Sequence, residues 1–443
     1  MKTGIIKTIF LALGIFTMFS CDQHAIFYTI STETEPQDAL INGSPTNMVV
    51  FNRKGTDVLY VASGRLHWYA KNSNGSTGWN SADHFTEQPG GRIIALASTI
   101  DYLYALCLTG HGVNTALLRL DHDGEKWMMI DSAAGNYPLI QSVYADPESN
   151  YLFAGACKND NNKNEFAILY LDDSPNPVWH DLVADSGMLS AVMLRNNIHY
   201  LSTRTRGKGI YQISELDLAD NNTAGVKHLT DNSDGANSRD WLFMGMIKLE
   251  DNGEEGQDEE EGDDTADPPI EPIPEIHPKP PKPPIIIAIE RGGALYEVNN
   301  GNFIRMKYMY KDETIGTGKN ATGALALWKD PYDPDVKILV AGVQDSALST
   351  SYTHGYVEFE IDSSNSPFIK ISNRNELSGM RTVSSHENYS SSLGKYPIIH
   401  LFQVPESIDA NKTFFASTQT VGLWSYRLRS GKWQWNAEAK NES

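Results

Sequence analysis

Residues 102–127 read YLYALCLTGHGVNTALLRLDHDGEKW, and this stretch decides the fold. The segments 102–106 and 115–120 are short runs of Leu, Ala and Tyr with the length and composition of β-strands. Glycine and asparagine separate the two runs, and another glycine lies just before Trp127, which is typical of turns. The stretch therefore predicts two antiparallel strands followed by a glycine turn that leads into a further strand.

Two neighbouring units have the same arrangement of an apolar run, a second apolar run and a tryptophan. They consist of residues 57–62, 64–69 and 78–79 before this stretch, and of residues 151–155, 166–171 and 178–179 after it. A further apolar run comes before each of the three units, at 48–51, 92–97 and 139–144. The recurring unit therefore contains four predicted strands.

The spacing of the units is regular. Leu66, Leu118 and Ile168 occupy equivalent positions in the third strand and are 52 and 50 residues apart. The pattern continues, with more divergence, in four further units. Their predicted strands are 189–194, 198–203, 209–213 and 226–229; 241–247, 285–289, 294–298 and 303–309; 324–328, 336–341, 356–361 and 368–371; and 396–404, 413–418, 423–428 and 433–435.

Seven four-stranded units predict an all-β fold, a seven-bladed β-propeller over residues 46–443. Each twisted sheet is apolar on both faces and cannot bury them alone, whereas radial stacking of the sheets buries them all. The alternative is a pair of β-sandwiches, but strands in sandwiches would not recur in fours. Helical periodicity is hard to find, so the propeller is the better interpretation.

The N-terminus has the pattern of an export signal that is replaced by lipid. Lys2 and Lys7 form a positive region, residues 8–19 are apolar, and Ser20 lies directly before Cys21. We expect a signal peptide over 1–20 and a lipidated Cys21 that anchors the chain to a membrane through fatty acids such as palmitate. An ordinary signal peptide is the alternative. A spanning anchor fits less well because the run is shorter than the roughly 20 residues needed.

Phe19 stands where the commonest bacterial lipobox has a small residue, and in this the motif resembles the relaxed lipobox of spirochaete lipoproteins. The resemblance implies a protein of the cell envelope, on the periplasmic face or the outer surface. Residues 21–45 are then a short tether, in which the β-prone run 25–30 is expected to add an outer strand to the last blade.

Residues 250–284 differ in composition from the rest of the chain. They contain thirteen acidic residues and two lysines, a net charge of −11 out of −20 for the whole chain, and they end in a proline-rich run. Such a segment cannot bury apolar surface, so we expect a disordered insertion within the propeller. A solvated spacer and an arm that binds a partner are both open. The acidic balance excludes nucleic acid as the partner, because binding needs a basic face.

Candidate chemistry is sparse. The sequence has no nucleophile elbow, phosphate loop or zinc motif. Cys107 and Cys157 lie in apolar runs and are expected to be buried free thiols. The segments 121–125 and 330–335 cluster carboxylates that could hold calcium, and polar turns are the favoured interpretation. Four tryptophans that recur in phase with the units are interpreted as packing residues rather than sugar-stacking platforms; they are Trp79, Trp127, Trp179 and Trp433.

The stretches 115–127 and 422–433, each an apolar strand followed by a glycine turn and a tryptophan, resemble repeats of the pyrroloquinoline-quinone-like propellers. That group includes the lipoprotein scaffold of the β-barrel assembly machinery, so the resemblance implies a non-catalytic scaffold. Sialidase-type propellers are the enzymatic comparison, and residues 121–127 only loosely match their Asp-box turn.

We therefore predict a lipid-anchored propeller that binds a protein partner in the cell envelope, is not an enzyme, and has no catalytic residues, cofactor or metal site. A propeller glycoside hydrolase or carbohydrate-binding protein of the sialidase-like type is the alternative.

Overall fold

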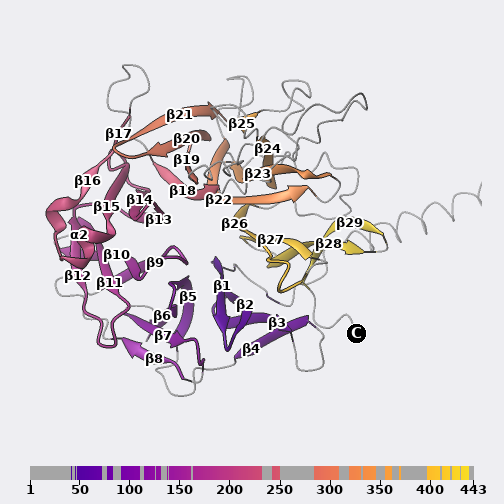
Figure 1. The fold of residues 1–443 in the computed structure, drawn as a ribbon, viewed down its shortest axis with the longest axis horizontal. Helices are drawn as coiled ribbons and strands as arrows, with labels where there is room; N and C mark the ends of the chain where they lie inside the picture. Colours follow the sequence, from indigo (N-terminus) through magenta and orange to yellow (C-terminus); the bar gives the residue numbers. More distant parts are fainter. Residues whose placement is uncertain are drawn as a thin grey trace, which may run out of the picture. The chain divides into compact units, whose positions relative to one another are not determined.

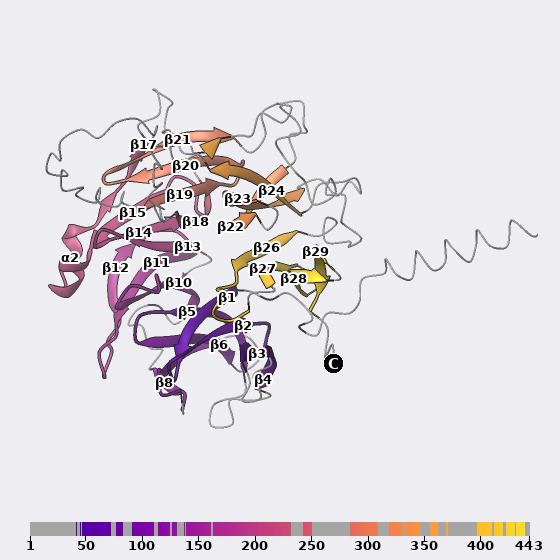
Figure 2. The same ribbon diagram turned by 45° about the vertical axis from the view of Figure 1, so that its right-hand side comes forward.

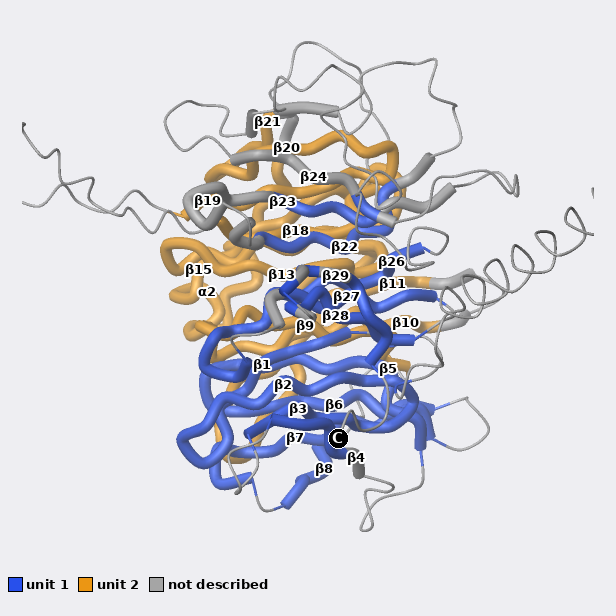
Figure 3. Tube along the Cα trace, turned by 90° about the vertical axis from the view of Figure 1, so that its right-hand side faces the viewer, with its two compact units in different colours: residues 1–132, 310–360, 371–443 blue, residues 133–309, 361–370 orange. Residues whose placement is uncertain are grey.

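The structure is a computed structural model of the chain. It describes residues 41, 45, 47–71, 77–82, 91–109, 114–124, 126–130, 137, 139–160, 163–231, 242–249, 284–308, 319–330, 333–345, 355–361, 369–370, 397–409, 412–419, 422–429 and 431–438. These residues form antiparallel sheets (Figure 1). The chain divides into two compact units, shown in different colours in Figure 3: unit 1 is residues 1–132, 310–360 and 371–443, and unit 2 is residues 133–309 and 361–370.

Unit 1 contains most of four sheets, each built from strands consecutive in the sequence. The first two are β1 (Asn47–Arg53), β2 (Thr56–Ala62), β3 (Leu66–Lys71) and β4 (Thr77–Ala82); and β5 (Gly91–Ser98), β6 (Tyr102–Thr109), β7 (Asn114–Asp121) and β8 (Met128–Ile130). The others are β22 (Lys319–Asp330), β23 (Asp333–Asp345), β24 (Gly355–Ile361) and β25 (Ile369–Lys370); and β26 (Ile398–Gln403), β27 (Lys412–Thr418), β28 (Leu423–Arg429) and β29 (Lys432–Ala437).

Unit 2 contains three sheets. They are β9 (Leu139–Tyr144), β10 (Tyr151–Asp160), β11 (Lys163–Asp172) and β12 (His180–Ala184); β13 (Leu189–Arg195), β14 (Ile198–Thr203), β15 (Ile210–Ser214) and β16 (Lys227–His228); and β17 (Thr230–Asp231), β18 (Phe243–Leu249), β19 (Ile285–Glu290), β20 (Ala294–Asn299) and β21 (Asn302–Tyr308). Figures 1 and 2 both show β13, β14 and β15 side by side.

The number of four-stranded blades needs a correction. Six of the seven sheets have four strands, whereas the sheet of β18–β21 has a fifth, β17, which pairs in parallel with β21. The sequence predicted seven four-stranded blades, and the number is six. A two-residue strand whose partner lies about seventy residues away leaves no apolar run that a sequence pattern could show.

Burial explains why the strands read as continuous apolar runs. Six consecutive residues of β7 are buried, and they include Arg119, whose guanidinium lies 4.5 Å from the ring centre of Tyr102. Alternating burial would indicate one solvated face, whereas continuous burial shows that both faces of the sheet are covered. The sheets within each unit therefore pack face to face, as the apolar clusters that join β1–β4 to β5–β8 show.

A bulge recurs in the first strand of most sheets. In β5, β9, β13, β18, β22 and β26, the pairing register with the second strand shifts by at least one residue. An extra residue in one strand bends it and re-aims a side chain. In β13 the extra residue is Ser190, whose Oγ atom donates to the carbonyl oxygen of Phe243 in the next sheet.

The segment before β1 is bonded to the sheet of β26–β29. The backbone N–H of Leu423 donates to the carbonyl oxygen of Ile41 at 3.2 Å, and Ser417 Oγ donates to the carbonyl oxygen of Pro45. Ile41 is fully buried among apolar residues of the first and last sheets of unit 1. The predicted strand at 25–30 lies outside the described residues.

Helical structure is confined to one short connection in the described ranges. Helix α2 (Glu215–Ala219) and the 3-10 turn η1 (Thr223–Gly225) link β15 to β16, and Ser214 caps α2 by accepting from the backbone N–H of Asp217. No helix in the described part of the chain has the length and apolar character needed to cross a bilayer.

Residues 250–284 connect two strands that are hydrogen-bonded neighbours. β18 ends at Leu249 and β19 begins at Ile285, and these two residues face each other in the antiparallel register. The residues between them, apart from Pro284, lie outside the described part of the chain.

Candidate functional site

The residues selected from the sequence do not converge on one site. Cys21 lies outside the described residues. Cys107 and Cys157 are buried free thiols, as predicted. Burial raises the pKa of Cys107 to about 12 and raises the pKa of Cys157, so both thiols stay protonated and unreactive at neutral pH.

The turn at 121–125 joins two sheets of unit 1. Asp121 Oδ1 accepts from the backbone N–H of Gly124 at 3.0 Å, and the ring of His122 stacks on Phe51. The two ring nitrogens of His122 lie 2.6 Å and 2.8 Å from the carbonyl oxygens of Asn52 and Ile100. These groups are used in packing, and the described residues contain no cluster of three or more His, Cys, Asp or Glu side chains suited to a metal ion.

The second acidic segment, 330–335, spans the end of β22 and the start of β23, and its side chains are outside the described part of the structure. Three of the four tryptophans pack as predicted. Trp79 contacts Tyr69 and Phe415, with ring centres 4.9 Å and 5.6 Å apart, while Trp127 and Trp433 pack against the cores of their sheets.

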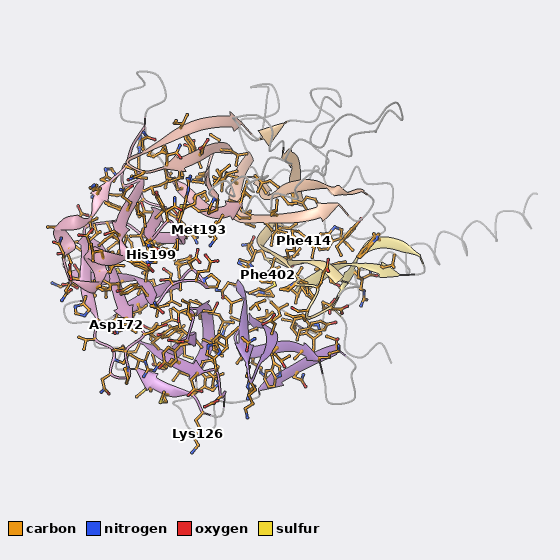
Figure 4. The ribbon with its side chains drawn as sticks, viewed as in Figure 1. Lys126, Asp172, Met193, His199, Phe402 and Phe414 are labelled. Atoms are coloured by element: carbon orange, nitrogen blue, oxygen red, sulfur yellow. The ribbon has the colours of Figure 1, made fainter. Side chains whose placement is uncertain are left out.

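A Ser, His and Glu group in unit 2 has the residue types of a hydrolase triad but not the geometry. Its central residue, His199, is labelled in Figure 4. Ser149 Oγ lies 3.4 Å from His199 Nε2, and Glu215 Oε1 lies 3.6 Å from the same nitrogen. A triad needs the serine on one ring nitrogen and the acid on the other. His199 is fully buried, and the hydrogen bond from it lowers the pKa of Glu215. The group therefore fastens β14 to α2.

Two acids and two aromatic residues meet in unit 1. Tyr69 donates to Asp409 Oδ2 at 2.5 Å, and Trp79 Nε1 donates to Glu438 Oε2 at 2.5 Å. Burial, followed by the hydrogen bond to Asp409, raises the pKa of Tyr69. Glu438 is only 2% exposed, so no polysaccharide could reach this carboxylate between the packed sheets. The pair is suited to joining the first and last sheets of unit 1.

Three sheets of unit 2 are linked by the carboxylate of Asp146. It accepts from the backbone N–H of Leu194 at 2.8 Å, and Lys248 Nζ lies 3.5 Å from its other oxygen. Lys248 also lies 2.5 Å from Glu148 Oε2. Asp146 is 1% exposed, which makes this network a clamp across the ends of β9, β13 and β18.

One described loop concentrates exposed positive charge. Residues 204–208, between β14 and β15, read RTRGK, and Arg204 and Arg206 are both exposed. Lys208 pairs with Asp185 at 2.7 Å, and His228 Nε2 donates to the carbonyl oxygen of Lys208 at 2.6 Å. We name residues 204–208 the basic loop.

Hydrogen bonds within the basic loop and to the residues that precede β13 hold the loop in one shape. Lys208 N–H donates to the carbonyl oxygen of Thr205 at 3.1 Å, and Thr205 Oγ1 accepts from the backbone N–H of Met188 at 2.9 Å. At its base, both the N–H and the Oγ1 of Thr203 donate to the carbonyl oxygen of Gly209. Gly187 passes so close that a Cβ atom there would lie 2.4 Å from Thr205 Cβ. The charged side chains therefore project from a rigid turn.

The basic loop lies at the opposite end of the strands from the exit of the acidic insertion. The starts of β13 and β18 are joined by the bond from Ser190 to Phe243, and their ends are joined through Asp146. β14 is antiparallel to β13, so the loop after β14 lies at the shared starts. Residues 250–284 leave from the end of β18.

Sequence reasoning missed the basic loop, although its signal is present. Three cations within five residues are conspicuous in a chain with a net charge of −20. Motif searches pass over such a segment because it has no catalytic spacing.

No protein-family model matches the chain, and no curated protein matches it. Among solved structures, it is similar to the GH74 xyloglucanase from Xanthomonas campestris, with 12% identity, a TM-score of 0.50, and coverage of 91% of this chain and 56% of that enzyme. The chain thus spans little more than half of that enzyme. Sqt1 of Saccharomyces cerevisiae matches with 11% identity, a TM-score of 0.45, and coverage of 92% of this chain and 90% of Sqt1.

The WD40 β-propeller domain of Doa1 matches with 8% identity, a TM-score of 0.44, and coverage of 90% of this chain and 96% of that domain. At these identities the similarities do not bear on activity. Together with the four-stranded antiparallel sheets, the similarity to the xyloglucanase shows that the chain has the all-β fold of a β-propeller.

Proposed function

We propose that this protein is a lipid-anchored, non-catalytic binding protein of the cell envelope, and that its partner docks at the basic loop. The observation that carries the binding role is the rigid turn at 204–208, which exposes Arg204 and Arg206 in a strongly acidic chain. Loops on a rigid β-scaffold are common binding sites, because the scaffold fixes their side chains in position.

The non-catalytic part of the proposal is supported by how the described acids and histidines are used. His199 holds Ser149 and Glu215 on a single nitrogen, and Glu438 is buried between packed sheets. Neither group offers a nucleophile with its base or a carboxylate pair open to a glycan. No contact in the described structure favours the glycoside hydrolase alternative.

The anchor is supported by the sequence of residues 1–21 alone. A single acyl chain gives only marginal membrane binding, so stable anchoring through Cys21 needs more than one chain. Metabolic labelling with an alkyne fatty acid tests this, with Cys21→Ser as the matched control. We expect label on the wild-type chain and none on the variant. Equal labelling of both, or of neither, would remove the anchor from the proposal.

The binding role is tested by pull-down from detergent-solubilised envelope. Three baits are compared: the wild-type chain, a chain without residues 251–283, and Arg204→Glu/Arg206→Glu. We expect the first two to recover the same protein partner and the charge-reversed bait to lose it. An outer-membrane barrel as partner would indicate assembly scaffolding. Recovery of glycan alone, with no protein, would contradict the proposal and favour the hydrolase.

A further inference from the structure

We propose that the basic loop recognises a carboxylate-rich segment of a partner protein. This inference rests on the proposed function and adds the chemistry of the partner. Its basis is a set of cationic and acidic side chains in unit 2, together with the geometry that fixes them.

The basic loop contributes three cationic side chains. Arg204 and Arg206 are exposed, and the side chain of Lys208 is 31% exposed. Lys208 pairs with Asp185, whose side chain is 87% exposed. An ion pair this exposed contributes little to stability, so Lys208 can exchange its carboxylate partner at small cost.

Arg204 also has neighbours that limit its freedom. Arg204 Nη2 donates to the hydroxyl of Tyr144 at 3.3 Å, and its backbone N–H donates to the carbonyl oxygen of Met188 at 2.8 Å. Planar guanidinium groups bind carboxylates through two parallel hydrogen bonds. A preorganised loop loses less conformational entropy when it binds, so a short acidic segment suffices as ligand.

The net charge of the chain argues for a protein partner over an extended polyanion. A nucleic acid, a sulfated glycan or an anionic membrane would face the whole surface of a chain with a net charge of −20 and be repelled beyond the loop. A short acidic peptide touches only the five residues of the basic loop and its neighbours. The local charge therefore decides binding for a peptide, and the net charge decides it for a polyanion.

Asp185 provides a second, independent test of carboxylate binding at the basic loop. Because its carboxylate already lies 2.7 Å from Lys208 Nζ, an incoming carboxylate must compete with it. Asp185→Asn removes this competitor and should strengthen binding by about threefold, whereas a merely structural ion pair predicts no gain.

The probe is a fluorescein-labelled peptide of roughly ten glutamates, measured by anisotropy with the full mature chain in detergent, beside an all-glutamine peptide of equal length. We expect the wild-type chain to bind the glutamate peptide and not the glutamine peptide. The affinity for the glutamate peptide should be at least about tenfold weaker for Arg204→Glu/Arg206→Glu, and it should fall at high salt. Lys126→Glu is the matched control. It makes one similar charge change at an exposed side chain of unit 1, which extends away from its sheet in Figure 4, and should leave affinity unchanged.

Heparin is measured in parallel under the same conditions, and vesicles of anionic phospholipid are measured without detergent against the unlipidated Cys21→Ser chain. Tighter binding of either than of the peptide, with loss in Arg204→Glu/Arg206→Glu, would overturn the protein assignment. No binding of the glutamate peptide, or an equal loss in Lys126→Glu, would overturn the inference altogether. These outcomes are separate from failure of the proposed function, which is shown by an envelope pull-down that recovers no protein even when the peptide binds.

Discussion

The sheet of β13–β16 and the sheet of β26–β29 have the same hydrogen-bonding pattern around the end of the second strand, which we call the frame. They differ in the loop that follows this strand. Thr203 and Thr418 each end the second strand and donate through both N–H and Oγ1 to a glycine carbonyl, of Gly209 and Gly422 respectively. The next residue in each case, Arg204 or Gln419, donates to the carbonyl before the first strand.

The serines that precede these threonines are equivalent too. Ser202 is hydrogen-bonded to Ser190, which donates to the next sheet of unit 2 at Phe243, and Ser417 donates to Pro45 in the segment before β1. Between threonine and glycine, however, one sheet has five residues with three cations and the other has the uncharged residues 419–421. The frame is a property of the fold, so the loop is where function was free to change.

The largest expected difference between the two frames is in their response to pH. His400 lies on β26 opposite Ser417, where the equivalent residue of β13 is Ala191. Its Nδ1 atom is buried with no hydrogen-bond partner among the described residues, and burial lowers the pKa of His400 to about 4. From about pH 6.5 down to about 4, the unfolded chain therefore binds a proton that the folded chain does not.

The free energy of unfolding should consequently fall by about 3 kcal/mol across this range because of His400 alone. Chemical denaturation of wild type and His400→Phe at several pH values isolates this contribution, since the carboxylates are common to both. We expect a flatter pH dependence for the variant. Parallel curves would show that His400 accepts a proton in the folded state without penalty.

The next effect tests how firmly the frame holds the basic loop. Gly187 has a φ of +88°, and a Cβ there would lie 2.4 Å from Thr205 Cβ, so Gly187→Ala should destabilise the fold by about 2–3 kcal/mol. Gly207→Ala is the matched control, because its φ is +74° but no atom lies within 4 Å of an added Cβ. The control should cost only about 1 kcal/mol, measured by thermal unfolding. Equal losses of stability would mean that backbone strain alone, and not contact with Thr205, sets the cost of the Gly187→Ala substitution.

A smaller effect tests whether the two frames are equivalent. Thr203→Val and Thr418→Val each remove one buried hydroxyl bond to a glycine carbonyl and should each lower stability by about 1 kcal/mol. Urea denaturation of the two variants provides the comparison. Losses that differ several-fold would show that one frame is reinforced by contacts which the other lacks.

The last test exchanges the loops. Replacing residues 204–208 by the Gln-Thr-Val sequence of residues 419–421 leaves the bonds from Thr203 to Gly209 in place but removes the bond from Met188 N–H to Thr205 Oγ1, and we expect a stability loss of no more than about 1 kcal/mol. Binding of the glutamate peptide should nevertheless be lost. A large loss of stability would show that the basic loop is part of the fold and would weaken its assignment as a binding site.

The sequence was sufficient for most strands because most of them are apolar runs bounded by turn residues, whereas the two-residue strand β17 (Thr230–Asp231) has no such run and was missed. The predicted unit 189–229 matches β13, β14, β15 and β16 to within a few residues. Helix α2 was missed because five residues, Glu215–Ala219, are too few to show a helical period, although Ser214 is a good cap. The bulges were invisible because an extra residue in a strand does not interrupt an apolar run.

For the sites, the sequence indicated residue types but not their surroundings. His400 could not be distinguished from a surface histidine, because its burial depends on the bulge in β26. For residues 121–125 the sequence left calcium binding open beside the favoured polar turn, and in the structure Asp121 Oδ1 accepts from the backbone N–H of Gly124 within that turn. The basic loop could have been found from charge alone, but its rigidity depends on Met188 and Gly187, which belong to another connection.

The way residues 250–284 join the sheet has a practical consequence. Leu249 and Ile285 face each other across an antiparallel ladder, so the two ends of the connection are fixed at about 5 Å. The entropy of closing a loop grows only with the logarithm of its length, so the sheet is nearly indifferent to what is spliced between these two residues. A fluorescent reporter or an affinity handle inserted at this position would therefore leave both chain ends untouched and the strands in register.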